Sequence, residues 1–138
     1  MLPSAIQALA KKPQLCPQKA VARKKRDRIA EIKAMPNVIE RPEGMAGQWH
    51  TYFGWTAPLT LELGCGKGEY TVALARWYPE QQFIGIDVKG DRMWVGARQA
   101  LDEGLHNVAF LRSPTENLTD HFGRHTVQRI WLTFPDPF

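Results

Sequence analysis

The sequence predicts an α/β fold in which a parallel sheet is doubly wound by helices, and three observations support that prediction. After residue 58, short apolar segments alternate with longer amphipathic segments. A glycine-rich turn joins the first apolar segment to the first amphipathic one, and a carboxylate ends the second apolar segment. Alternating strands and helices pair in parallel through right-handed crossovers, which places helices on both faces of an open sheet. Ligands bind such sheets at the carboxyl ends of the strands.

The individual elements follow from the periodicity and from the residues that interrupt it. Strands are expected over residues 59–63, 82–87, 107–111 and 128–134. Helices are expected over residues 69–78, over 90–103 before a terminating Gly104, and over a short segment near 115–122. Residues 37–58 are rich in glycine, proline and aromatic side chains, so they are expected to be irregular, with the aromatics serving as core or docking residues.

The N-terminal segment differs in charge from the rest of the chain. Residues 1–35 contain nine Lys and Arg residues against Asp27 and Glu31, whereas the whole chain carries a net charge of only +4. A basic helix over 19–34 is expected to end before Pro36, because proline disfavours helix in the preceding residue. Residues 1–36 are therefore expected to form a basic arm, ahead of a domain over residues 37–138. The arm suits contact with a polyanion such as RNA, although a solvated basic helix has the same composition.

Composition excludes several functional classes. No apolar run approaches the roughly 20 residues that cross a bilayer, so the protein is expected to be cytoplasmic, without a membrane partner. Cys16 and Cys65 are the two cysteines of the chain, too few for a disulfide framework or a zinc cluster. No metal is therefore expected in the site.

The glycine-rich turn spans residues 64–68 and is predicted to line a cofactor. Gly64, Gly66 and Gly68 follow a strand and precede a helix, where a tight turn and a close ligand require residues without a Cβ. The six-residue spacing and the Ser or Thr of a P-loop are absent, which excludes an NTPase of that kind. The spacing G-x-G-x-G also differs from the G-x-G-x-x-G of dinucleotide sites.

Two carboxylates accompany the turn. Asp87 ends a strand 19 residues beyond Gly68, where a carboxylate can accept the ribose hydroxyls of an adenosine group, or simply cap the helix that begins near Gly90. Glu62 lies two residues before the first glycine and would need a cationic partner if buried. The ammonium of S-adenosylmethionine qualifies, and a salt bridge to Lys67 or Arg92 is the structural alternative.

Together these motifs resemble one enzyme family, the bacterial tRNA guanine-N7 methyltransferases that modify position 46. The resemblance covers residues 25–138 and rests on Gly47-Gln48-Trp49, Phe53-Gly54, LELGCGKG at 61–68, FIGID at 83–87 and TFPDP at 133–137. It implies a Rossmann-like, class I methyltransferase fold that uses S-adenosylmethionine and acts on tRNA. It also implies that Glu62 and Asp87 contact the cofactor, and that Asp136 is the catalytic residue where methyl donor and guanine meet.

Three departures from the family pattern qualify the resemblance. Phe138 follows the final Asp-Pro, and Pro114 stands where many members have an acid, which leaves Glu116 as a candidate contact to the adenine edge. Family members also continue with a basic stretch and further strands, so the chain is expected to be incomplete at its C-terminus, marginally stable and inactive by itself. Two alternatives stay open: a methyltransferase of this fold with another substrate, and a non-catalytic tRNA-binding remnant.

Overall fold

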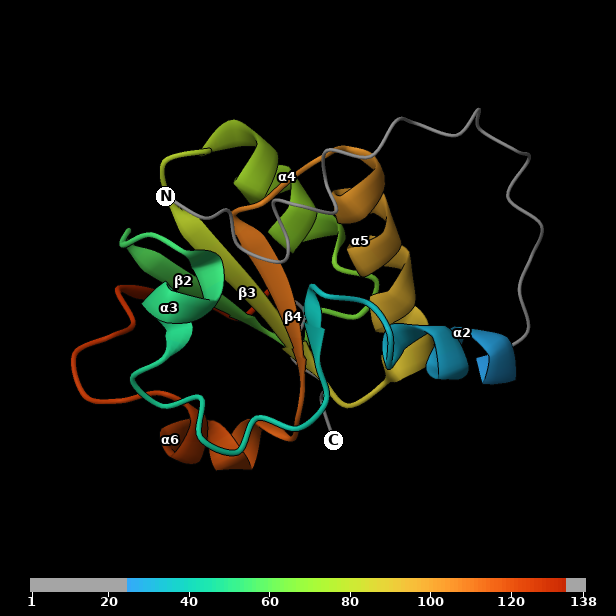
Figure 1. Cartoon of the computed structure of the whole chain (residues 1–138), viewed down its shortest axis with the longest axis horizontal. Helices are drawn as coiled ribbons and strands as arrows, with labels where there is room; N and C mark the ends of the chain where they lie inside the picture. The colour runs from blue at the N-terminus through green and yellow to red at the C-terminus, as the bar shows by residue number, and fades with distance from the viewer. Residues whose placement is uncertain (1–24, 134–138) are drawn as a thin grey trace.

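A computed structural model describes residues 25–133 of the chain (Figure 1). The described residues form one parallel sheet with the strand order β1-β4-β3-β2-β5. Its strands are β1 (Val38–Ile39), β2 (Leu59–Leu63), β3 (Gln82–Asp87), β4 (Val108–Arg112) and β5 (Arg129–Trp131). The helices are α2 (Lys25–Ile32), α3 (Trp49–Phe53), α4 (Glu69–Trp77), α5 (Gly90–Asp102), the 3-10 turn η1 (Thr115–Asn117) and α6 (Leu118–His121).

Each face of the sheet has its own hydrophobic core, because successive side chains of a strand point to opposite faces. Phe83 and Phe110 belong to a core that includes residues of α2, α4 and α5. Their strand neighbours Ile84 and Leu111 belong to the other core, which includes residues of α3 and Phe122 after α6. Helices thus cover both faces (Figure 1), and the predicted doubly wound α/β architecture is confirmed.

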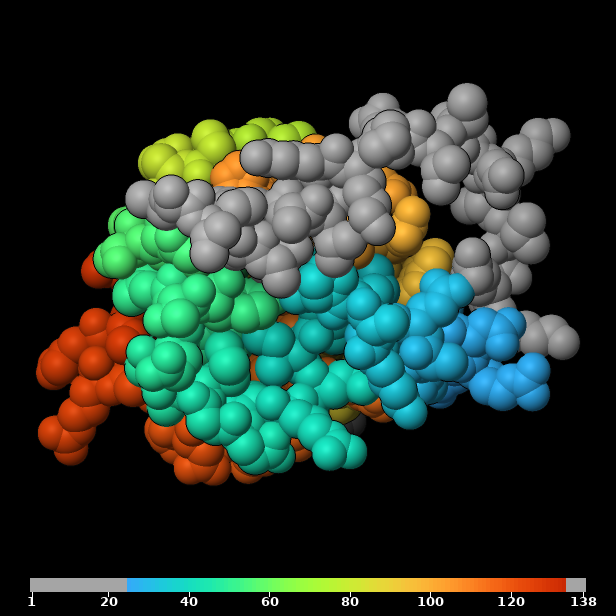
Figure 2. All heavy atoms as spheres, viewed as in Figure 1, coloured from blue at the N-terminus to red at the C-terminus, as the bar shows by residue number. Residues whose placement is uncertain are grey.

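The prediction that residues 37–58 are irregular was wrong at two places, because two short elements form there. β1 pairs with β4, and Asn37 just before it donates from its side chain to the Ala97 carbonyl at 2.9 Å. α3 buries its first residue, Trp49, which donates to the His121 carbonyl at 2.8 Å and stacks on Phe122. Both elements depend on partners more than 50 residues away, which explains the missing local signal. The segment covers much of one molecular face (Figure 2).

The regular elements agree with their predicted positions within a few residues. α4 and α5 end one residue earlier than expected, and β4 is shifted by one residue. The described part of the basic arm, α2, packs along α5 and places Ile32 in the core; residues 19–24 of the predicted helix lie outside the described residues. β5 ends at Trp131, and among the described strands it pairs only with β2, so Ile130 and Leu132 are more than half exposed.

Gly68 offers a test of how tightly the glycine turn packs against the sheet. Its φ is +72°, and an added Cβ would lie 2.6 Å from the Phe110 ring and 3.4 Å from Gly96. We expect Gly68→Ala to lower the free energy of unfolding by about 3 kcal/mol, because it combines overpacking with a left-handed backbone. Gly47→Ala is the matched control, since Gly47 has a φ of +77° with open space around it, and should cost about 1 kcal/mol. Urea denaturation measures both, and equal losses would contradict the packing argument.

Candidate functional site

The glycine turn connects β2 to α4 at the carboxyl edge of the sheet. The amides of Gly64 and Cys65 both donate to the Ile86 carbonyl, at 2.8 and 3.0 Å, which ties the turn to the end of β3. The three glycines have φ values between +55° and +72°. A Cβ on Gly64 or Gly66 would meet nothing within 4 Å, whereas Gly68 faces Phe110. Two of the predicted cofactor-lining glycines therefore border open space, and the third packs helix α4 against the sheet.

Asp87 ends β3 and binds the glycine turn directly. One of its oxygens, Oδ2, accepts the amide of Gly66 at 2.9 Å. The other, Oδ1, accepts the amides of Val88 at 2.7 Å and Lys89 at 3.0 Å, just before α5. A carboxylate offers about four acceptor positions, so this arrangement leaves about one free, on Oδ2. The hydrogen bonds of the helix-capping alternative are thus present, and Oδ2 can still accept one hydroxyl donor.

Glu62 lies one strand away, in β2, and only 4% of its surface is exposed. Its two carboxylate oxygens accept the hydroxyl groups of Thr71, at 3.0 Å, and Thr133, at 2.9 Å. Burial raises the pKa of the Glu62 carboxyl above its usual value, and the two threonine hydrogen bonds oppose that rise. The alternative salt bridges to Lys67 and Arg92 do not form. Neither threonine was predicted as a partner of Glu62, because nothing local marks a hydroxyl that bonds a distant carboxylate.

The structure brings both carboxylates close to the glycine turn. Burial raises the pKa of the Cys65 thiol well above its usual value, and the negative charges of Asp87 and Glu62 raise it further. Cys65 is therefore a buried neutral thiol next to two carboxylates. The result is a local excess of negative charge at the edge of the sheet, which is suited to a ligand that carries a positive charge and hydroxyl groups.

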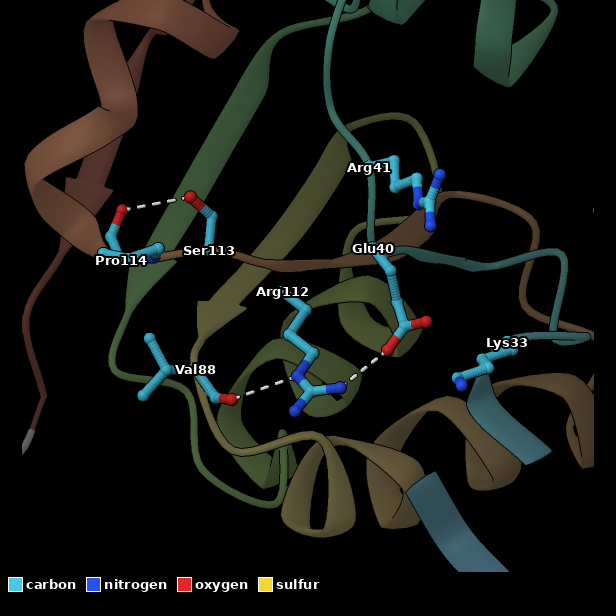
Figure 3. A pocket seen from close by; sticks show the side chains of 7 residues that line it. All are labelled: Lys33, Glu40, Arg41, Val88, Arg112, Ser113 and Pro114. Carbon is cyan, nitrogen blue, oxygen red and sulfur yellow. Dashed lines mark hydrogen bonds and ion pairs between the residues drawn. The ribbon is translucent and has the colours of Figure 1, made fainter. Parts of the chain in front are cut away.

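A pocket of about 370 Å³ lies beside Asp87, between the ends of β3, β4 and β1 (Figure 3). Its walls are formed by Lys33, Glu40, Arg41, Val88, Arg112, Ser113 and Pro114. Pro114, a predicted cofactor contact, is thus at the pocket, whereas Glu116 is exposed on η1 and does not line it. Arg41 and Arg112 were not singled out in the sequence, and Lys33 was counted only as part of the basic arm, because nothing local brings these three residues together.

Several predictions concern features at the margins of the described region. The predicted catalytic residue, Asp136, lies outside the described residues. Thr133, three residues before it, bonds to Glu62, so the last described part of the chain lies at the site.

Within residues 25–133 no three His, Cys, Asp or Glu side chains are arranged to hold a metal ion. None of the helices in this range has the length and apolarity that spanning a membrane requires.

Comparison with known proteins decides the family. Residues 56–138 match the family described as "Putative methyltransferase". The chain belongs to this methyltransferase family. A protein of Porphyromonas gingivalis named tRNA (guanine-N(7)-)-methyltransferase is 55% identical over 94 residues, which cover 67% of this chain and 38% of that protein. A protein of the same name from Bacteroides thetaiotaomicron is 44% identical over 126 residues, covering 85% of this chain and 50% of that protein.

Solved structures of other methyltransferases share the fold of this family member. The structure titled "Structure of an Antibiotic Related Methyltransferase" superposes with a TM-score of 0.55 at 20% identity, covering 86% of this chain and 50% of that one. This likeness supports the Rossmann-like architecture alone. The chain spans half or less of the length of the two curated relatives. Membership of a methyltransferase family implies a methyl donor, and the carboxyl edge of the sheet is the candidate position for it.

Proposed function

We propose that the protein transfers a methyl group from S-adenosylmethionine to N7 of the guanine at position 46 of tRNA. The observation that carries the cofactor half is the pair of carboxylates, Glu62 and Asp87, on adjacent strands beside an open glycine turn. The name shared by the curated relatives supports the substrate half. The activity, the cofactor and the tRNA partner are all parts of this proposal.

The chemistry of the described residues fits S-adenosylmethionine, which when bound supplies a methyl group on a positively charged sulfur. Glu62 is buried without a cationic partner among the described residues, yet each of its oxygens can accept one further hydrogen bond. The ammonium of the cofactor is the partner that such a carboxylate needs. The free position on Asp87 Oδ2 suits a ribose hydroxyl. The space beside Gly64 and Gly66 leaves the backbone accessible to the ligand that joins these two groups.

The adenine end of the cofactor is proposed to lie in the pocket next to Asp87. Val88 and Pro114 supply apolar surface there, and the Ser113 hydroxyl bonds to the Pro114 carbonyl at 3.1 Å (Figure 3). The same hydroxyl lies 3.1 Å from His121 Nε2. Pro114 would contact the ring by packing instead of by a carboxylate. Glu116 stays a candidate for the adenine edge from the exposed turn η1.

Methyl transfer to guanine N7 demands little proton chemistry from the protein. The N7 atom has an in-plane lone pair and no proton, so no general base is needed, and alignment of donor and acceptor dominates the rate. Positive charge moves toward the purine as the methyl group leaves sulfur. Asp136 is proposed to stabilise that charge electrostatically and to orient the base. The carboxylates Glu62 and Asp87 serve to fix the donor.

Basic side chains near the pocket favour an RNA substrate over a small molecule. Lys33 and Arg41 line one side of the pocket, and neither forms an ion pair with another described residue. Exposed cations of this kind bind phosphates and release counterions. Together with the basic segment at the N-terminus, they support tRNA contact along this side of the domain.

Two measurements on one preparation test the proposal. Calorimetric titration with S-adenosylmethionine is expected to show binding by the folded chain. Methyl transfer is then measured with labelled cofactor and protein in excess over tRNA, and a transcript with 7-deazaguanosine at position 46 is the control, because it lacks the N7 lone pair. Label in guanosine but not in 7-deazaguanosine tRNA would establish the reaction.

Other results separate the remaining readings. Cofactor binding without transfer agrees with the predicted inactivity of the isolated chain. Label in the 7-deazaguanosine transcript contradicts N7 as the target. A folded chain that binds tRNA but gives no heat with S-adenosylmethionine contradicts the methyltransferase proposal and favours the non-catalytic tRNA-binding reading.

A further inference from the structure

Arg112 joins three segments of the chain beside the candidate cofactor site. It is the last residue of β4 and is paired in register with Asp87 of β3. Its Nε donates to the Val88 carbonyl at 3.1 Å, and its Nη1 donates to Glu40, just after β1, at 2.7 Å (Figure 3). The side chains of Arg112 and Glu40 are only 32% and 22% exposed. This pair is therefore partly shielded from water, unlike the more exposed Arg98–Asp102 pair on α5.

The bond from Arg112 to Val88 acts on the same peptide group that holds Asp87. The carbonyl of Val88 and the amide of Lys89 belong to one planar peptide. That amide donates to Asp87 Oδ1 at 3.0 Å. Arg112 therefore fixes the orientation of the peptide from one side, and Asp87 receives the hydrogen bond on the other. A charged donor on the carbonyl also polarises the peptide, which strengthens the donation from its N–H group.

The adjacent backbone leaves room for this side chain. A Cβ on Gly90, the first residue of α5, would lie 3.2 Å from the Arg112 guanidinium and 2.5 Å from the Ile32 side chain of α2. Glycine at this position therefore lets the guanidinium pass beside the start of α5. The N-terminal segment, through Glu40, holds the other end of the same guanidinium.

We propose that Arg112 is a positioning residue for the ribose of the cofactor. It orients the peptide between residues 88 and 89, and through that peptide it holds the free oxygen position of Asp87 toward a ribose hydroxyl. Glu40 fixes Arg112 in turn, so the segment after β1 contributes to the orientation of Asp87. The inference rests on the proposed function, because it requires an adenosine-containing cofactor at Asp87.

The test measures recognition of the ribose hydroxyls separately from overall binding. S-adenosylhomocysteine and its 2′,3′-dideoxy analogue are titrated calorimetrically into the wild-type chain, Arg112→Met and Glu40→Gln. Arg112→Met is expected to weaken binding of S-adenosylhomocysteine about tenfold and to change binding of the dideoxy analogue less than about twofold. Glu40→Gln keeps an acceptor but loses the charge. It should reduce the ratio of the affinity for S-adenosylhomocysteine to the affinity for the dideoxy analogue, but by less than Arg112→Met does. Arg98→Met is the control, because Arg98 forms an exposed ion pair with Asp102.

Each outcome decides the proposal. If Arg112→Met weakens binding of both ligands equally, its role is purely structural and the proposal is overturned. Unchanged binding of S-adenosylhomocysteine would also overturn the proposal. If Arg112→Met does not fold, the Glu40→Gln ratio decides in the same way. Loss of binding in Asp87→Asn with wild-type behaviour in both Arg112→Met and Glu40→Gln would overturn the positioning role and leave the proposed function intact. A folded wild-type chain that binds neither ligand would overturn both.

Discussion

Asp87→Asn is expected to weaken binding of S-adenosylmethionine by about 30- to 150-fold, which corresponds to about 2 to 3 kcal/mol. Asparagine can keep its oxygen toward the amides of Val88 and Lys89. Its amide group, however, would face the Gly66 N–H as a second donor, so that contact is lost. The substitution also removes the negative charge and the free acceptor position that a ribose hydroxyl would use. The lost charge and the lost acceptor position are the features that the cofactor would use, so a large effect on affinity is expected.

The measurement is calorimetric titration at constant pH, with chemical denaturation of the same variants. Asp102→Asn is the matched control, because it makes the same chemical change at the exposed end of α5, where Asp102 pairs with Arg98. The control should bind S-adenosylmethionine as the wild-type chain does. Affinity of Asp87→Asn within about twofold of the wild-type value would mean that Asp87 is only a helix-capping residue.

Glu62→Gln is expected to change stability and cofactor affinity in opposite directions. The carboxylate is buried and accepts only neutral threonine hydroxyls, so its ionised form costs free energy in the folded state without ligand. Glutamine removes that cost while the two hydroxyls can still find a partner. We expect the free energy of unfolding at pH 8 to rise by about 1 kcal/mol. Affinity for S-adenosylmethionine should fall by about 100-fold, since the charge that meets the ammonium is lost.

The pH dependence supplies the sign of the effect. The pKa of Glu62 is raised in the folded state above its ordinary value of 4.5, so in the window above pH 4.5 the folded chain holds more protons than the unfolded chain. The contribution of Glu62 to stability therefore falls as pH rises through its folded pKa. The difference in unfolding free energy between Glu62→Gln and wild type should grow from pH 4.5 upward and then level off.

Urea denaturation across this pH range checks the prediction, with Glu80→Gln as control because Glu80 is exposed in the loop before β3. The control should leave both properties unchanged. A Glu62→Gln variant that is less stable than wild type at pH 8, or that binds the cofactor equally well, would show that the carboxylate serves the fold and not the ligand.

Much of the candidate site could be predicted because its signals are local. Gly64 and Gly66 sit in a turn between a strand and a helix, and their positive φ values reflect a backbone that glycine adopts without strain. Glu62 is the next-to-last residue of β2, and Asp87 ends β3, the following strand of an alternating α/β pattern. Parallel pairing of β2 and β3 then places both carboxylates at one edge of the sheet. The alternation of strands and helices was sufficient to predict this edge of the sheet, because right-handed crossovers leave few other arrangements.

The remaining features depended on contacts between distant segments. β1 and α3 are too short to be stable by themselves, and Asn37 and Trp49 hold them through hydrogen bonds to Ala97 and His121. Gly68 is predicted from the sequence to line the cofactor, and only the structure shows that the ring of Phe110 fills the space where its Cβ would be.

The sequence by itself determined the fold class, the glycine turn and the two carboxylates, because each follows from local spacing and from the chirality of the chain. Only the tertiary structure decided what surrounds those carboxylates. Glu62 accepts two threonine hydroxyls, Asp87 accepts three backbone amides, and Arg112 bonds to Glu40. These hydrogen bonds join residues from separate elements. Such contacts form only after the sheet has brought those elements to one edge, so no local pattern encodes them.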